Sequence, residues 1–295
     1  MSSATRSTDT SAAGGVVLGA NHYGKHEVRV VKVVKHEDRH ELRDVRVDVA
    51  LEGDFEAAHV FGDNTGLIAT DTMRNTVYAL AKEHLTGSLE SFGRALVDRF
   101  LDVGPSVRAA RARLVEYPWE RIAAGGKPHP HGFLRGSGGN RVATVRGTAE
   151  GATISAGLED LFVLKSTGSG WEGFLREEYT SLAETSDRIM ATIVTAAWDY
   201  AGGDVDFDAA YAGVRDTILA TFDDHYSPSV QMTLYRMGEA VLQAHPEVER
   251  ISFSLPNKHH LLYDLGRFGM GNDNEIFHAT NEPYGLIEGT IERAR

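Results

Sequence analysis

The hydrophobic residues of this chain follow two different periods, which alternate along the sequence. The stretch 27–35 is rich in valine, and apolar residues occupy every second position of 45–51, as expected of strands with one buried face. Apolar residues then recur every three or four positions over 70–81 and 89–100, which predicts two amphipathic helices. Extended sequence resumes at Val107.

The second half of the chain repeats this arrangement. The apolar stretches 161–165 and 189–198 are expected to be extended, and helical spacing follows at 207–222 and 230–241. The stretch 251–255 alternates apolar and polar residues again, which predicts a further strand. The order strand, strand, helix, helix, strand, strand therefore occurs twice, which indicates a tandem repeat.

We expect residues 19–150 and 151–295 to form the two repeats. A tail at 1–18, rich in Ser, Thr, Ala and Gly, is expected to be disordered because it has nothing periodic to bury. Runs of strands interleaved with helix pairs favour an α+β fold, an antiparallel sheet with helices on one face. The other face of such a sheet would need cover, which predicts oligomerisation.

Local signals suggest where the elements begin. Thr70 or Asp71 is expected to be the N-cap of the first helix, and Ser227 followed by Pro228 is expected to begin the last one. A third extended piece is expected just before the loop 62–64.

Composition narrows the classes of function. The 295 residues carry a net charge of −12, which argues against nucleic acid as the main partner, and no apolar run approaches the roughly 20 residues that span a bilayer. The absence of cysteine excludes disulfides and thiolate chemistry and suits a reducing compartment, so we expect a cytoplasmic protein.

The end of the strand at 251–255 carries candidate chemistry. The two-residue period projects Asn257 and His259 to the same side, so an amide and an imidazole converge on one volume. Pro256 gives no ladder N–H and indicates an edge or a bulge. The alternative is a Pro-Asn turn in which His259 and His260 are merely solvated.

A second candidate site is the pair His129 and His131. On a strand this spacing points both rings the same way and could begin a metal site, although a third ligand cannot be assigned. The alternative is a rigid structural turn, which Pro128 and Pro130 favour.

Four separate stretches resemble the urate oxidase (uricase) family, and the resemblance runs in order from about Tyr23 to Thr290. They are Tyr23-Gly24-Lys25, Ala69-Thr70-Asp71 with Asn75-Thr76, the signature opening at Leu161-Phe162-Val163-Leu164-Lys165-Ser166-Thr167 and continuing to Arg188, and Ser229-Val230-Gln231 with Leu255-Pro256-Asn257-Lys258-His259. The chain departs from the family at Trp171, where phenylalanine usually stacks on the substrate.

The resemblance implies a fold and a reaction. Two tandem tunnelling-fold repeats would assemble into an oligomeric barrel with a central tunnel, as a homotetramer with active sites at subunit interfaces. The reaction would be oxidation of urate by O2 and water to 5-hydroxyisourate and hydrogen peroxide, with no metal and no organic cofactor.

The resemblance also implies roles for individual residues. Arg188 and Gln231 would grip opposite edges of urate, because a guanidinium donates a fixed fork and an amide both donates and accepts. Trp171 would stack on the ring. The remaining predicted substrate contacts are Thr70, Asp71, Val230 and Asn257, with Asn257 holding O2 above the ring.

The predicted catalytic relay consists of Lys25, Thr70 and His259, in which lysine and histidine can activate a threonine hydroxyl that is passive on its own. Lys25 and Thr70 would come from one subunit, and its neighbour would supply Arg188, Gln231, Asn257 and His259. Two further functions stay open from the sequence. One is a non-catalytic purine- or pterin-binding protein of the same fold, and the other is a metal-dependent hydrolase that uses His129, His131 and His259.

Overall fold

The computed structural model describes residues 15–202 and 204–294. The predicted disordered tail falls mostly outside this range, since 1–14 are not described, while 15–18 are exposed and belong to no helix or strand. None of the helices within the described ranges is long and apolar enough to cross a membrane.

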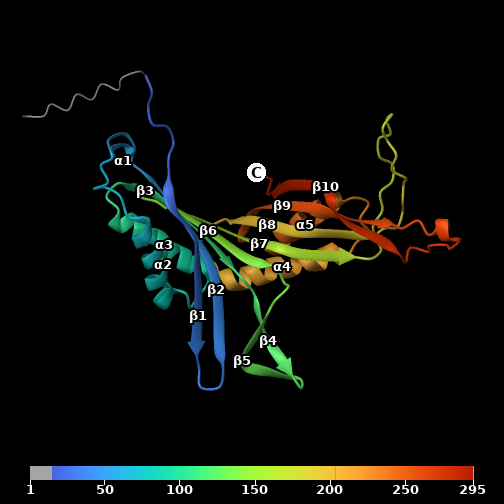
Figure 1. Cartoon of the computed structure of the whole chain (residues 1–295), viewed down its shortest axis with the longest axis horizontal. Coiled ribbons are helices and arrows are strands. Elements are labelled where there is room, and N and C mark those ends of the chain that lie inside the picture. The colour runs from blue at the N-terminus through green and yellow to red at the C-terminus, as the bar shows by residue number, and fades with distance from the viewer. Residues whose placement is uncertain (1–14, 203, 295) are drawn as a thin grey trace, which may run out of the picture.

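The described residues form a large sheet, a small hairpin, two pairs of long helices and one short helix (Figure 1). The strands of the large sheet are β1 Tyr23–Lys35, β2 His40–Gly53, β3 Val107–Glu116, β6 Asn140–Thr148, β7 Gly151–Lys165, β8 Met190–Tyr200, β9 Val248–Leu262 and β10 Phe277–Glu292. The hairpin consists of β4 Trp119–Ala124 and β5 Lys127–Arg135. The helices are α1 Glu56–Phe61, α2 Thr70–His84, α3 Leu89–Val103, α4 Phe207–Asp223 and α5 Val230–Ala244, and a 3-10 turn spans Gly266–Phe268.

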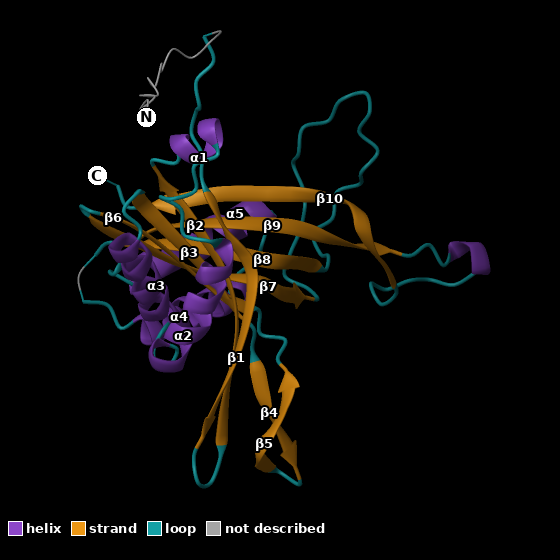
Figure 2. Cartoon of the chain, turned by 60° about the vertical axis from the view of Figure 1, so that its left-hand side comes forward, coloured by secondary structure: helices purple, strands orange, loops and turns teal. Residues whose placement is uncertain are grey.

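The large sheet is antiparallel throughout, in the order β1-β2-β3-β6-β7-β8-β9-β10. The four long helices, α2 to α5, lie against one face of it (Figure 2). The α+β prediction, with helices on one face, is therefore confirmed. Each half of the chain contributes two strands, two long helices and two more strands to the sheet, in that order.

Alternation along the strands explains why the helices pack on that face only. Val45, Val47 and Val49 on β2 are fully buried beneath α2 and α3, whereas Arg46 and Asp48 between them point to the opposite face. The opposite face is thus polar in this region. Elsewhere on this face large hydrophobic side chains are exposed, among them Val31 and Val33 of β1 and Phe162 and Leu164 of β7. The oligomerisation expected from the sequence stays a prediction.

Two hydrophobic clusters fill the space between sheet and helices, one in each half. Phe92 and Phe100 of α3 pack in the first cluster, and Trp198 of β8 and Met237 of α5 pack in the second. The division of the chain into repeats at residue 150 stays an interpretation of this arrangement.

Gly24 shows how closely the first two strands approach. A Cβ atom built on Gly24 would lie 1.8 Å from the carbonyl oxygen of Val49, so no larger residue fits at this position. The pairing of β1 and β2 shifts register between Lys25 and Val28, and Glu27 adopts φ 59° there. This bulge directly follows the lysine that the sequence analysis assigned to catalysis.

Several local predictions are wrong. The piece expected to be extended before residue 62 is the helix α1. The N-cap of α2 is Ala69, without a capping side chain, so that Thr70 is the first helical residue, and α5 begins after Ser229 instead of at Ser227. His129 and His131, for which a rigid turn was the favoured alternative, lie in strand β5.

Candidate active site

A cavity of about 950 Å³ opens in the second half of the chain, between the loop that precedes β8, the first turn of α5 and the ends of β9 and β10. Its walls are mostly apolar. Six of the residues predicted from the sequence line it, namely Trp171, Arg188, Val230, Gln231, Asn257 and His259.

Asn257 and His259 are half-buried on β9, and Nδ2 of the amide lies 3.5 Å from Nδ1 of the imidazole. The predicted convergence of these side chains is therefore observed, and the alternative of a Pro-Asn turn is wrong, because 256–260 lie within the strand. Pro256 does not mark a sheet edge, since β9 has neighbours on both sides. The irregularity lies in β10, whose register shifts between Thr280, opposite His259, and Gly285, opposite Asn257.

Arg188 lies two residues before the start of β8, and its side chain lines the cavity. Its backbone N–H donates to the carbonyl oxygen of Ser169 (2.8 Å), and its Nε donates to the hydroxyl of the same serine (3.4 Å). Burial lowers the pKa of Arg188, although an arginine remains a cation at any physiological pH. The guanidinium carbon lies 5.9 Å from the centre of the Trp171 ring, so a cation and an aromatic wall adjoin in the cavity.

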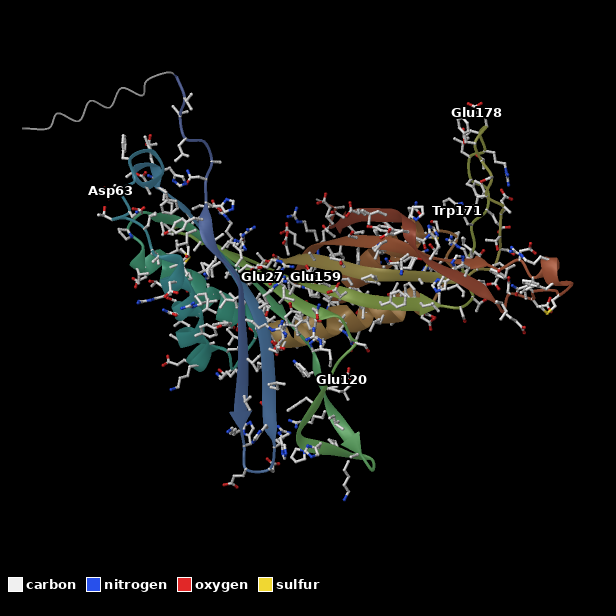
Figure 3. The ribbon with its side chains drawn as sticks, in the orientation of Figure 1. Glu27, Asp63, Glu120, Glu159, Trp171 and Glu178 are labelled. Atoms are coloured by element: carbon white, nitrogen blue, oxygen red, sulfur yellow. The ribbon has the colours of Figure 1, made fainter. Side chains whose placement is uncertain are left out.

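Trp171 is held at the base of the long loop that rises from the sheet (Figure 3). Its backbone exchanges two hydrogen bonds with Thr185 across the loop, at 2.7 and 3.1 Å. Its ring stacks on Phe174 with a centroid separation of 5.7 Å and an angle of 12°. Phe174 lies outside both core clusters and supports the indole from behind.

Val230 and Gln231 are the first two residues of α5. The hydroxyl of Ser229 caps the helix by accepting from the backbone N–H of Met232 (3.1 Å). The unpaired N–H groups and the dipole of a helix N-terminus favour an anion. Val230 is only 4% exposed and belongs to the core as well as to the cavity wall.

The other predicted residues lie elsewhere in the chain. Lys25 is on β1, and Thr70 and Asp71 begin α2; none of the three lines the cavity. The carboxylate of Asp71 contacts residues of its own helix: it forms an ion pair with Arg74 (2.6 Å) and accepts a hydrogen bond from the side-chain amide of Asn75 (3.2 Å). Strands β1 and β9 are six positions apart in the sheet, or roughly 29 Å at about 4.8 Å per strand. A single chain therefore does not bring Lys25, Thr70 and Asp71 to the residues that line the cavity.

Sequence reasoning missed the residues that β10 contributes to the cavity wall, which include Phe277, His278 and Thr280, and Glu282-Pro283 in its register shift. They carry no motif, and only the pairing of β10 with β9 could have pointed to them. His260, which the sequence analysis left unassigned, also lines the cavity, and its Nδ1 donates to the carbonyl oxygen of Lys258 (3.0 Å).

The rings of His129 and His131 contact each other edge to face at 4.6 Å, and His40 lies 5.8 Å from His131. These histidines lie away from the cavity, so they do not join His259. Across residues 15–202 and 204–294, no group of three or more histidine or acidic side chains has the arrangement of a metal site.

Comparison with known proteins identifies relatives over nearly the whole chain. The family model described as Uricase matches residues 21–146 and 154–288. The uricase of Arthrobacter globiformis is 47% identical over 98% of this chain and 94% of its own length, and the uricase of Aspergillus flavus is 39% identical over 93% and 96%.

Solved structures agree with this result. The crystal structure of the Arthrobacter globiformis uricase, 48% identical, superposes with a TM-score of 0.90 over 95% of this chain and 96% of that one. A urate oxidase from Bacillus sp. TB-90 has a TM-score of 0.80 at 20% identity, over 92% of this chain and all of that one, which shows the same fold.

Proposed function

This chain belongs to the uricase family, and from this premise we propose that it oxidises urate with O2 and water to 5-hydroxyisourate and hydrogen peroxide. The observation that carries the proposal is the cavity in which Arg188, Gln231, Trp171, Asn257 and His259 meet. The cavity combines a planar cation, an amide, an aromatic wall and two polar groups on β9. A flat anion rimmed with carbonyl and N–H groups requires such a set.

The reaction balances without a further oxidant. Urate gives up two electrons, and O2 accepts them together with two protons to become hydrogen peroxide. Water adds its oxygen to C5 of the oxidised ring, which becomes 5-hydroxyisourate. The protein's task is therefore to hold the ring, to keep oxygen and then water above it, and to move protons.

Arg188 and Gln231 hold the ring by its edges. The half-buried guanidinium presents parallel N–H donors to a carbonyl edge, and its positive charge compensates the anion. Gln231, in the first turn of α5, both donates and accepts, and the free N–H groups of this turn add to the attraction. Trp171 supplies the stacking face, and Val230 closes the apolar wall.

Asn257 and His259 act above the ring. The amide of Asn257 holds O2 and later water, and the neighbouring imidazole, 3.5 Å away, takes part in proton transfer. Lys25 and Thr70 complete the relay, because a lysine amine and a threonine hydroxyl can pass protons between substrate, water and the oxygen species. No cofactor is needed in this scheme, since urate itself is the source of electrons.

The relay requires a second subunit. Lys25 and Thr70 lie near the edge of the sheet formed by β1, whereas the cavity of their own chain lies near the other edge. A neighbouring chain therefore has to bring its β1 and the start of its α2 to this cavity. Asp71 would arrive with Thr70, and the helix N-terminus they form would meet the five-membered ring of urate.

The sheet edges support this assembly. Among the described residues, β1 and β10 are each paired on one side only, and they are 13 and 16 residues long. Long unpaired edges are a template for pairing with another chain. Joining β10 of one chain to β1 of the next would close a barrel whose inner face is the face opposite the helices. Two such rings would stack into a homotetramer with a central tunnel.

The test is direct. Purified protein, exhaustively treated with chelator, is mixed with urate in air, and hydrogen peroxide and the loss of urate absorbance are followed together. Peroxide formed in equal amount to the urate consumed supports the proposal. If chelation abolishes the reaction and added metal restores it, the cofactor-free scheme is wrong. If urate binds but is not consumed, the non-catalytic binding protein replaces the enzyme. The cytoplasmic location rests on composition alone and stays a prediction.

A further inference from the structure

Behind the cavity wall lies a cluster of buried hydroxyl groups joined by one imidazole. Ser227 and Thr233 are fully buried, and their oxygens are 2.7 Å apart. The imidazole of His225 contacts both, with Nε2 3.0 Å from the Thr233 hydroxyl and 3.2 Å from the Ser227 hydroxyl. His225 itself does not line the substrate cavity.

The tautomer of His225 follows from its other nitrogen. Nδ1 lies 2.8 Å from the carbonyl oxygen of Thr221, and because a carbonyl can only accept, Nδ1 carries the hydrogen. Nε2 of the neutral ring is therefore an acceptor for a hydroxyl. The backbone is fixed as well, since Lys165, a buried lysine whose pKa is lowered by burial, donates to the carbonyl oxygen of His225 (2.7 Å).

This cluster is connected to the two segments that carry Gln231 and Arg188. Thr233 lies two residues beyond Gln231 in the first turns of α5. Ser227 exchanges two backbone hydrogen bonds, of 2.8 and 2.9 Å, with the glycines on either side of Ser169. Ser169 in turn accepts from the backbone N–H and from Nε of Arg188. The imidazole and the hydrogen bond between the two hydroxyls together link the helix that carries Gln231 to the loop that carries Arg188.

We infer that His225 is a positioning residue that sets the separation between Gln231 and Arg188 and so tunes the affinity for the flat anion between them. The inference rests on the proposed function, in which these two side chains hold opposite edges of urate. The hydrogen bond between Thr233 and Ser227 uses only one of their two hydroxyl hydrogens, so without the acceptor at His225 the other hydrogen loses its partner. The first turn of α5 can then shift relative to the loop, and the two side chains no longer match both edges of one rigid ring.

The test measures binding apart from turnover. Xanthine, a flat purine dione that lacks the C8 oxygen of urate, serves as the probe. We expect His225→Ala to raise the dissociation constant of xanthine and the KM for urate about tenfold, the equivalent of one lost hydrogen bond, with a smaller change in kcat. Thr233→Val, which removes only the hydroxyl, should have the same effect, and the double variant should be no worse than either one. His225→Gln, which restores an acceptor, should recover part of the affinity.

His245 provides the matched control. It lies at the other end of α5, about 20 Å away at 1.5 Å per residue, and its ring bridges Thr217 (3.1 Å) and Glu247 (3.2 Å). His245→Ala should lower the stability of the α4–α5 pair and leave the xanthine dissociation constant unchanged. A general loss of stability would instead affect both histidine variants alike.

A Gln231→Ala background completes the test. If His225 acts through the placement of Gln231, His225→Ala should change the xanthine dissociation constant by less than about twofold in that background, because coupled residues are not additive. Unchanged affinity in the otherwise wild-type chain, or the full tenfold loss in the Gln231→Ala background, would overturn the inference. The proposed function fails separately, if the wild-type protein forms no peroxide from urate.

Discussion

The amide of Asn257 and the imidazole of His259 lie 3.5 Å apart on one side of β9, with a register shift of β10 directly opposite them. A strand normally continues its hydrogen-bonding ladder on both sides. Here β10 leaves the ladder between Thr280 and Gly285, and the two polar side chains face a cavity in its place. The cavity therefore owes its polar end to a break in strand pairing.

Replacing Asn257 by leucine tests whether this end of the cavity handles oxygen. Leucine has a similar volume and leaves Arg188 and Gln231 untouched, so xanthine should bind within about threefold of wild type. Turnover of urate should fall by about 10², the loss associated with misplacing a reacting group. Titration calorimetry gives the xanthine dissociation constant and a peroxide assay gives the turnover rate, both measured on one preparation. Full turnover in the variant would mean that oxygen is held elsewhere.

Much of this architecture could be predicted because residue periods encode it. The alternation at 45–51 and the helical spacing at 89–100 reappear as β2 and α3. Helix α1 was missed because its six residues are too few to show a period. The hairpin β4–β5 was missed because prolines argue against strands, and it tolerates them as an isolated two-stranded unit.

The site was predictable only in part, from residue types and their spacing. The residue types of Asn257 and His259 and their two-residue spacing pointed to one shared volume. The contribution of β10 depends on which strand pairs with β9, and that pairing is decided by the packing of the whole second half. His225 was missed because a histidine between two helices carries no signal of its own until its hydroxyl partners are placed.

Arg188→Lys should weaken binding while keeping the positive charge. Lysine lacks the planar fork, so the affinity for xanthine should fall by at least the roughly 1.5–3 kcal/mol of a charge-assisted hydrogen bond. Arg176→Lys, on the same loop but in contact with Phe174 and outside the cavity wall, is the control and should bind normally. Equal affinities of the two variants would remove Arg188 from the binding site.

Trp171→Phe should retain activity. Phenylalanine restores the residue usual in the family and keeps an aromatic face toward the substrate, and Phe174 remains behind it as support. Trp171→Ala removes the face and should cost about 0.5–1.5 kcal/mol of xanthine affinity beyond the loss of buried area. Steady-state kinetics on both variants measure the effect. Complete inactivity of Trp171→Phe would show that the ring at this position does not stack on urate.

Glu90 on α3 predicts a pH dependence of stability. Its carboxylate is fully buried, accepts from Arg141 (2.8 Å), and joins the two halves because Arg141 also contacts Asp208 of α4 (2.5 Å). Burial raises the pKa of Glu90, and Arg141 opposes this only in part. The folded state therefore binds the proton more readily than the unfolded state, whose pKa is about 4.3.

The sign of the effect follows from this difference. Stability contributed by Glu90 should fall as the pH rises from about 4.3 to the raised folded pKa, and should stay constant above it. Glu90→Gln has no proton to lose. The free energy of unfolding of wild type minus that of Glu90→Gln should therefore decrease over this window, as measured by urea denaturation at a series of pH values. A difference that increases with pH would contradict the raised pKa.

Complementation between two inactive chains tests whether the site is shared. Lys25→Met removes the amine of the relay and should lower turnover by about 10²–10⁴, and Asn257→Leu damages the cavity in the other half of the chain. If each site takes β1 from one subunit and β9 from its neighbour, a mixed assembly contains sites built from the intact part of each chain. At equal amounts, a site receives an intact Lys25 with a chance of one half and an intact Asn257 with a chance of one half. About a quarter of wild-type activity should therefore return when both chains are unfolded and refolded together.

Chains refolded separately and then combined provide the control and should stay inactive as long as subunits do not exchange. A site formed within one chain would give no recovery in either case, because every chain would keep its own defect.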